Sequence, residues 1–186
     1  MFFSVIRTIM AGGQVDIPTV AAQVLAIIFV IICILPLHEL AHGWIAYKLG
    51  DPTAKLERRL TLNPLASVDP IGTVWLFLFG FGWARPVPVD PRYFRKPKRD
   101  MAIVALAGPV SNLLAALAGA LLLNVMLVIA GYNGVNSVLY FVYTLLSYYV
   151  MVNVTLAAFN LLPIPPLDGS KILGAFLSDR ALETYY

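Results

Sequence analysis

Residues 27–44 read IIFVIICILPLHELAHGW, an apolar run that is interrupted by His38, Glu39 and His42. Histidines four residues apart lie on one face of a helix, close enough for both imidazoles to bind a single metal ion. Glu39 follows His38 by about 100° round the helix, so a carboxylate stands beside the pair. Ionisable groups in a membrane segment cost about 2.5–3.5 kcal/mol each and persist mainly where they serve a reaction, a cofactor or a pathway. The stretch therefore predicts chemistry inside a bilayer.

The composition of the whole chain predicts an integral membrane protein. Of the 186 residues, 60% are hydrophobic and only 12% are charged, and the mean hydropathy is +0.81, which is beyond an ordinary soluble domain. The net charge of +3 comes from basic residues in loops without interleaved aromatic residues, which argues against nucleic-acid binding. Cys33 is the single cysteine and is predicted to be a small packed side chain.

The first membrane span contains the two histidines. Residues 17–37 carry no charge, and at about 1.5 Å per residue they cover a hydrocarbon core of about 30 Å. The helix is predicted to continue through the histidines toward Tyr47 and to stop at Gly50. Pro36 lies just before the histidines, where it either loosens the helix or is simply a tolerated membrane proline. No cleaved signal peptide is predicted before this span.

Two more spans are predicted over residues 101–130 and 138–162. Small or polar residues recur every fourth position along residues 101–130, and such a face packs closely against another helix. The members of this face are Gly108, Asn112, Ala116 and Ala120, with Ser111, Ala115 and Gly119 alongside.

The region between the first and second spans is more varied. Residues 55–64, KLERRLTLNP, alternate apolar and charged side chains, which favours a short edge strand able to pair with an unwound substrate, or else a solvated connector. Residues 71–83 are apolar but too short to cross a membrane, so a re-entrant hairpin or an interfacial segment is expected. Residues 84–97 form an extended loop because of their prolines. The predicted fold is therefore an all-α polytopic membrane protein, with transmembrane helices round a metal site and a short re-entrant or β-like segment.

Charge predicts the orientation of these spans. Basic residues gather on one side of the predicted membrane, and the positive-inside rule places that side in the cytoplasm. The turn at residues 131–136 carries no charge, as expected of the opposite side. The active site would thus face the cytoplasm from a multi-pass protein in the cell membrane. The basic residues are Lys48, Lys55, Arg58, Arg59, Arg92, Arg95, Lys96, Lys98 and Arg99.

A third metal ligand is predicted after the last span. Residues 160–169, NLLPIPPLDG, contain three prolines in four positions and cannot continue a regular helix. Irregular backbone at membrane depth is buried in protein or lines a wet cavity. The chain has just two histidines, and a catalytic zinc ion needs three protein ligands and an open position, so Asp168 is the candidate. The alternative is that Asp168 caps a helix beginning near Ser170.

These motifs together resemble the site-2 protease family of zinc-dependent intramembrane metalloproteases. HELAH at residues 38–42 is similar to the HExxH helix of that family, and NLLPIPPLDG is similar to its NxxPxPxxDG-like motif. The stretches LNPLASVDPIGT, GWARPVPVDPRYFR and AGPVSN resemble the compact prokaryotic members that have no PDZ or CBS domain. The likeness covers about residues 20–174. Many relatives resemble LNPLxHxDP where this chain has Ser67, so a histidine role there does not carry over.

The resemblance implies a set of roles. His38, His42 and Asp168 would bind one zinc ion, and Glu39 would act as general base and acid. Asn160 would position the substrate or its oxyanion, although an interhelical hydrogen bond is an equal alternative. The implied partners are the lipid bilayer and transmembrane substrates, which must unwind before cleavage; a homo-oligomer stays open. Residues 1–186 would be a single transmembrane metalloprotease core. Whether this core is truncated after residue 186 stays open.

Two other classes of protein use paired histidines. A haem protein is disfavoured because imidazoles at this spacing face the same side and cannot be opposite axial ligands of one haem. The pair could also be core imidazoles or a structural metal site. A metal transporter or an inactive scaffold could keep the metal ligands, but it would need Glu39 less than an enzyme does. The Glu39→Gln variant therefore separates these readings from the enzyme.

Overall fold

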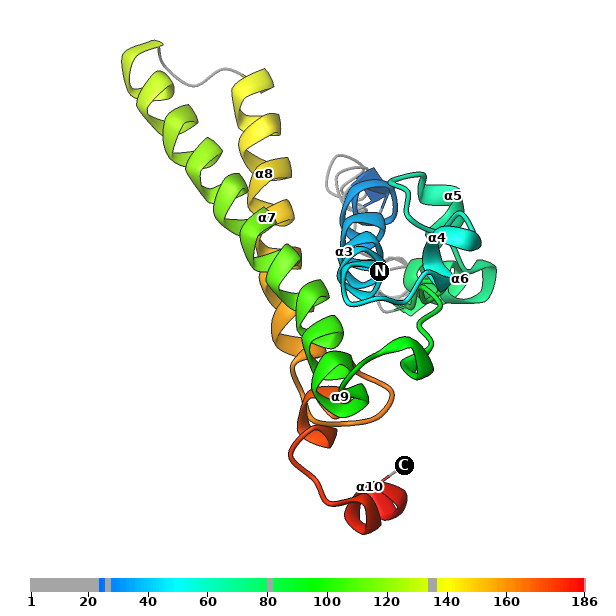
Figure 1. The fold of residues 1–186 in the computed structure, drawn as a ribbon. Helices are drawn as coiled ribbons and strands as arrows, with labels where there is room; N and C mark the ends of the chain where they lie inside the picture. Colours follow the sequence, from blue (N-terminus) through cyan, green and yellow to red (C-terminus); the bar gives the residue numbers. More distant parts are fainter. Residues whose placement is uncertain (1–23, 26–27, 80–81, 134–136, 186) are drawn as a thin grey trace, which may run out of the picture.

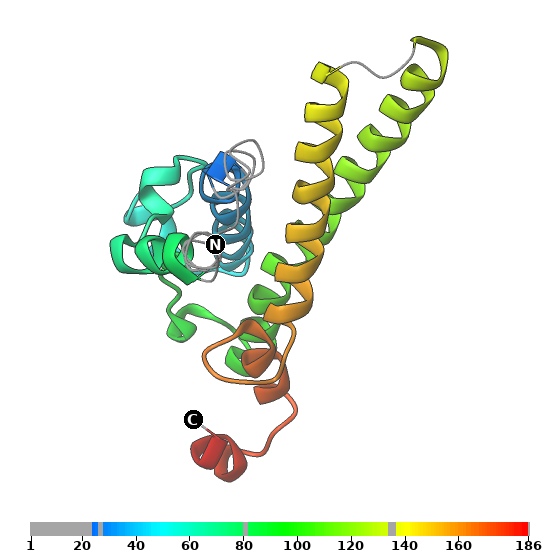
Figure 2. The same ribbon diagram turned by 180° about the vertical axis from the view of Figure 1, so that it is seen from behind.

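The computed structural model describes residues 24–25, 28–79, 82–133 and 137–185, and this described part is helical without a strand. Two long helices, α7 (Pro97–Asn133) and α8 (Ser137–Asn160), run antiparallel and project from a body of shorter helices (Figure 1). The helix α3 (Leu35–Lys48) packs against the N-terminal part of α7, and Figure 2 shows the same arrangement from behind. The all-α fold class is thus confirmed for the described residues.

The histidine-bearing helix ends where the sequence predicts. A π-helical turn, η1 (Val30–Ile34), leads into α3, and Pro36 occupies the first turn of α3, where its missing N–H is tolerated. The helix type thus changes just before Pro36. At the other end, Gly50 adopts a φ of +109°, a conformation that favours glycine and turns the chain away. Residues 17–23 and 26–27 of the predicted first span lie outside the described residues.

The predicted close packing of α7 on α8 is confirmed. A Cβ atom on Gly119 would lie 2.8 Å from the Tyr149 ring and 2.9 Å from the Val150 side chain. Ala115 and Ala116 of the same face are also buried. The absence of larger side chains on this face lets the two backbones approach.

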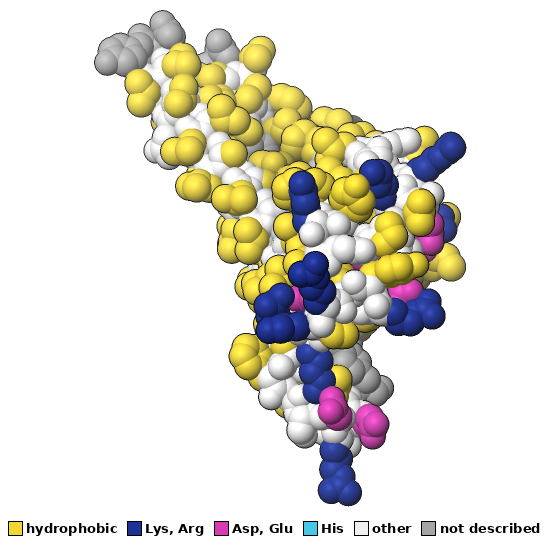
Figure 3. Space-filling model, in the orientation of Figure 1, with side chains coloured by type: hydrophobic (Ala, Val, Ile, Leu, Met, Phe, Trp, Pro, Cys, Tyr) yellow, Lys and Arg dark blue, Asp and Glu magenta, His cyan; other side chains and the backbone are white. Residues whose placement is uncertain are grey.

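Both long helices expose most of their apolar surface. Each is long and apolar enough to cross a membrane, yet only 22% of the most apolar window of α7 and 11% of that of α8 are buried. A core helix of a soluble protein would bury such a surface. Hydrophobic side chains accordingly cover the long helices in Figure 3. The exposed residues include Leu113, Leu114, Leu117, Leu121, Leu122, Val125 and Met151.

The predicted edge strand at residues 55–64 is wrong. The chain there forms one helical turn, α4 (Thr53–Leu56), a bend at Arg58 with a φ of 55°, and the start of a second turn, α5 (Pro64–Ser67). A strand needs a neighbour to receive its backbone hydrogen bonds, and the described part of the chain places none beside this segment. Asn63 instead caps α5 by accepting a hydrogen bond from the Leu65 amide.

The next segment is a helix followed by a return. The helix α6 (Pro70–Phe79) is about 15 Å long, too short to span a membrane, as predicted. The chain then folds back on α6. This return brings Trp83 so close to Gly72 that a Cβ atom on Gly72 would meet the backbone of Trp83. The entry of this segment into the bilayer stays a prediction. Residues 82–90 form neither helix nor strand, a short turn η2 (Pro91–Tyr93) follows, and the predicted loop is confirmed.

Two short helices complete the fold: α9 (Asp168–Gly174) and α10 (Asp179–Tyr185). The helix α9 packs against α7. Lys98 at the start of α7 donates a 2.9 Å hydrogen bond to the Leu177 carbonyl and lies 2.7 Å from a carboxylate oxygen of Asp179. A small core of Ala46, Phe94 and Val104 joins α3 to α7. These contacts bring the loop after α8 to the same place as the histidines of α3.

Candidate metal centre

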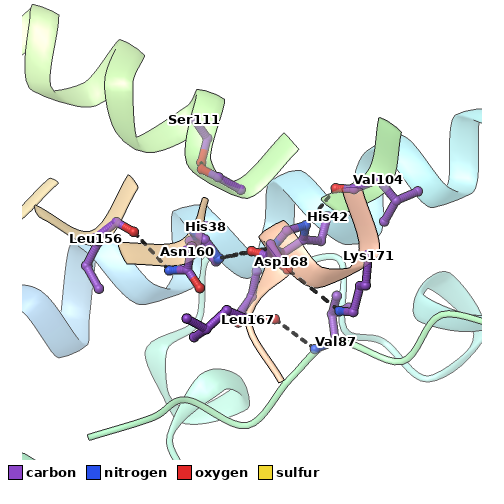
Figure 4. Close-up of polar contacts among 12 residues, drawn as sticks. His38, His42, Val87, Val104, Ser111, Leu156, Asn160, Leu167, Asp168 and Lys171 are labelled. Atoms are coloured by element: carbon purple, nitrogen blue, oxygen red, sulfur yellow. Dashed lines mark hydrogen bonds and ion pairs between the residues drawn. The ribbon is translucent and has the colours of Figure 1, made fainter. Parts of the chain in front are cut away.

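The two histidines and the predicted third ligand meet at one buried point. His38 and His42 are 7% and 6% exposed, and their Nε2 atoms lie 3.0 Å apart on the face of α3 toward α7. The Oδ2 atom of Asp168, from the start of α9, is 3.3 Å from His38 Nε2 and 3.1 Å from His42 Nε2. Figure 4 shows the three side chains converging, two from α3 and one from α9. These residues form a group that could hold a metal ion.

The spacing of the three atoms fits zinc. Ligand atoms in a tetrahedral zinc site with bonds of about 2.0–2.1 Å lie about 3.3–3.4 Å apart. The three observed edges of 3.0, 3.1 and 3.3 Å are close to that value. Three acceptor atoms so near one another are unfavourable in a buried place unless a proton or a cation lies among them.

The backbone prepares His42 for a metal. His42 Nδ1 lies 2.7 Å from the Val104 carbonyl oxygen, so the ring donates its Nδ1 hydrogen to α7 and leaves the Nε2 lone pair free. Metal-binding histidines are held by this kind of contact, which sets both the tautomer and the ring orientation. His38 Nδ1 is buried and makes no hydrogen bond within the described part of the chain.

Gly108 of α7 leaves room at the centre. A Cβ atom on this residue would lie 2.6 Å from His38 Nε2 and still closer to His42 Nε2. Any side chain at this position would therefore enter the space between the ligand atoms. The glycine is thus part of the cradle in which a metal ion would fit.

Asp168 faces the histidines and does not cap its helix. Leu167 occupies the N-cap position of α9, where no side-chain capping bond forms, and Asp168 is the first helical residue. Burial by itself would raise the pKa of Asp168, but the imidazoles of His38 and His42 beside its carboxylate outweigh this effect, and the pKa lies below its ordinary value. Lys171 Nζ lies 3.6 Å from the other carboxylate oxygen. The geometry favours the ligand reading over the cap.

Glu39 lies beside the three ligands without joining them. Its half-buried carboxylate accepts a 2.8 Å hydrogen bond from the Val87 amide. It follows His38 directly on α3, which places a carboxylate next to the centre. This position suits a proton acceptor, and the assignment of that role stays a prediction.

Asn160 is the last residue of α8, at the point where the chain leaves for Asp168. Its Nδ2 atom donates a 3.0 Å hydrogen bond to the Leu156 carbonyl of the same helix. The interhelical bond that was the alternative is therefore not the contact observed. A role in positioning substrate stays a prediction.

Sequence reasoning missed several parts of this centre. Gly108 was expected only to let helices pack, although it lies in the quoted AGPVSN stretch. The Val104 carbonyl and the Val87 amide are backbone groups, which any residue supplies and which leave no signal in the sequence. Lys171 follows Asp168 by one helical turn, a spacing that could have marked it as a partner.

Comparison with known proteins identifies the family. The sequence model of peptidase family M50 matches residues 125–184, which include all of α8 and α9. YwhC of Bacillus subtilis is 46% identical over 143 residues, which are 74% of this chain and 62% of that protein. The chain belongs to peptidase family M50. Further relatives are Rip2 of Mycolicibacterium smegmatis, 33% identical over 76% of this chain and 53% of its own length, and MJ0392 of Methanocaldococcus jannaschii, 29% identical over 83% of this chain and 35% of its own length.

The names of these relatives include zinc. YwhC and Rip2 are named as predicted zinc metalloproteases, and MJ0392 is named as a zinc metalloprotease. The zinc in these names agrees with the group of His38, His42 and Asp168, which could hold a metal ion. This M50 chain spans less than two thirds of the length of YwhC and of Rip2. No solved structure gave a significant match. Family and apolar helices together indicate a membrane protein.

Proposed function

We propose that the protein is a zinc-dependent endopeptidase that hydrolyses peptide bonds within or near transmembrane segments of membrane proteins. The observation that carries the proposal is the convergence of His38, His42 and Asp168 at one buried point, with Glu39 adjacent. The centre lies beside long helices whose apolar surfaces remain exposed. Zinc as cofactor and peptidase as class agree with the family and with the names of its members.

The residues divide the chemistry among them. His38, His42 and Asp168 would hold the ion, and a zinc ion held there supplies an activated water and polarises the carbonyl of the peptide bond. Asp168 also offsets part of the positive charge in a buried place. Glu39 accepts the proton that the attacking water loses and passes a proton to the departing amine. Gly108 keeps the space between the ligands open.

The substrate class follows from the surroundings of the site. A centre beside lipid-exposed helices meets the membrane segments of other proteins, and the carbonyls of those segments are hydrogen-bonded within a helix. A substrate helix must open before a carbonyl can be attacked, so helix-breaking residues should favour cleavage. Asn160, at the end of α8, is proposed to help hold the opened segment.

The proposed topology is multi-pass, with the centre toward the cytoplasm. Basic side chains gather over the shorter helices and the base of α7, whereas the far end of the long helices is hydrophobic (Figure 3). This distribution supports a cytoplasmic location of the basic end. Cleavage would then release fragments inward. A homo-oligomer is compatible with this arrangement.

The direct test is a cleavage assay with purified protein in detergent. A single-span substrate is incubated with the protein as purified, after treatment with a zinc chelator, and after zinc is restored. We expect cleavage that the chelator abolishes and zinc restores. Cleavage that persists after complete removal of metal would contradict a zinc peptidase. An absorption spectrum of the same sample tests the haem alternative.

A further inference from the structure

An extended segment crosses the histidine-bearing helix at Glu39. We name residues 84–90, ARPVPVD, the proline strap. The Val87 amide of the strap donates its 2.8 Å hydrogen bond to Glu39 Oε2. Gly43 lies one turn beyond Glu39 on the same face of α3, and a Cβ atom there would lie 3.0 Å from the Val87 side chain. The strap therefore lies directly on α3, and the missing side chain of Gly43 permits this approach.

Both ends of the strap are fixed by hydrogen bonds. At its start, the Arg85 amide donates to the Ser67 carbonyl at 2.9 Å, and Arg59 donates to the Arg85 carbonyl at 2.7 Å. At its end, the Asp90 amide donates a 2.8 Å bond to the carboxylate of Asp51, which is completely buried behind the end of α3. The fixed ends thus hold Val87, in the middle of the strap, in a defined position next to Glu39.

The sequence of the strap leaves one donor at this position. Pro86 and Pro88 have no N–H group and have fixed φ angles. Val87 between them therefore contributes the only amide hydrogen of the three residues, and this hydrogen goes to Glu39. The amide of Val89 makes no hydrogen bond within the described part of the chain.

We propose that the main-chain amide of Val87 is a positioning group for Glu39. Its bond to a charged carboxylate is of the stronger kind, and it holds one oxygen, Oε2, in place. The other oxygen, Oε1, then points to a defined place and is the one that accepts the proton. This inference rests on the proposed function, because it assigns the strap a part in the same reaction.

The test removes the amide hydrogen without removing the strap. Val87→Pro abolishes the donor in a segment that is already extended, and Val89→Pro is the matched control, the same change two residues away. Misplacing a reacting group by about 1 Å costs up to about 100-fold in rate. We expect Val87→Pro to lower kcat about 10- to 100-fold relative to Val89→Pro, with KM and zinc content unchanged. In the Glu39→Gln background, the same change should have no further effect.

A second measurement keeps the inference testable if Val87→Pro fails to fold. In protein labelled with ¹⁵N-valine, the Val87 amide resonance is assigned by its loss in Val87→Ala. A hydrogen bond to a carboxylate shifts an amide proton downfield, so Glu39→Gln should move this resonance upfield. A Val87 resonance that Glu39→Gln leaves in place would overturn the inference.

The outcomes separate the inference from the proposed function. Equal kcat in Val87→Pro and Val89→Pro, with Glu39→Gln inactive, would overturn the inference and leave the peptidase intact. A higher kcat in Val87→Pro would also overturn it, because the strap would then restrain Glu39. Zinc-loaded wild-type protein that cleaves nothing would overturn the proposed function and the inference with it.

Discussion

At the scale of single residues, the metal centre depends on Gly108 having no side chain. A methyl group there would lie among the ligand nitrogens of His38 and His42. We expect Gly108→Ala to lose zinc and activity while the protein stays folded. The matched control is Gly131→Ala on the same helix, where an added Cβ meets nothing within 4 Å. Metal analysis of both purified variants measures the effect. Full zinc occupancy in Gly108→Ala would contradict this placement of the centre.

Asp168 is the residue at which a ligand and a helix cap predict different results. Asparagine caps a helix about as well as aspartate, so Asp168→Asn would be nearly harmless in a cap. A ligand role predicts a loss of zinc affinity of at least about 10-fold. Mutating a residue that only hydrogen-bonds to a metal ligand already lowers metal affinity by that much. Asp179→Asn is the control, because Asp179 also lies in the first turn of a short helix. Normal zinc content and cleavage in Asp168→Asn would remove it from the ligand set.

Residue patterns singled out the three residues that meet at this centre, but not the groups that surround them. The HELAH spacing places two imidazoles on one face of any helix, and the shortage of histidines directs attention to Asp168. The first inference depends on the local geometry of a helix, and the second depends on the number of histidines in the chain. The roles of Gly108 and Val87 depend on which distant segments touch α3, and nothing in the spacing along the chain contains that information.

At the scale of elements, the pairing of α7 with α8 depends on Gly119. A larger side chain would press on Tyr149 and Val150, and overpacking of this kind costs about 1–3 kcal/mol. We expect Gly119→Leu to lower the thermal unfolding midpoint in detergent. Ala118→Leu on the neighbouring exposed position should change the midpoint little. Equal midpoints for the two variants would show that the helices do not pack as described.

Long apolar runs in the sequence predicted α7 and α8 well, whereas the structure of the segment between α3 and α7 was only partly predicted. Residues 55–64 have the alternation of a strand, but a strand forms only where a neighbouring chain accepts its hydrogen bonds. Pro52 and Pro64 instead favour the first turns of short helices there. A re-entrant hairpin or an interfacial segment was expected around α6, because the segment is too short to cross a membrane alone, and which of the two it forms stays a prediction.

At the scale of the whole molecule, the basic end of the protein should lie in the cytoplasm. In a Cys33→Ala background, cysteine is introduced at Asn133 or at Lys96. A membrane-impermeant maleimide applied to intact cells should label position 133 and not position 96. Labelling of position 96 alone would reverse the orientation, and with it the inward release of products.

The central claim is that Glu39 acts as the base of a zinc peptidase in the membrane. Glutamine at this position keeps the size of the side chain and leaves His38, His42 and Asp168 in place, but it cannot accept a proton. The decisive measurement is the cleavage rate of a single-span substrate by wild-type and Glu39→Gln protein of equal, measured zinc content. The rate should fall about 100-fold or more, as for the loss of a general base. Unchanged cleavage by zinc-loaded Glu39→Gln protein would contradict the account.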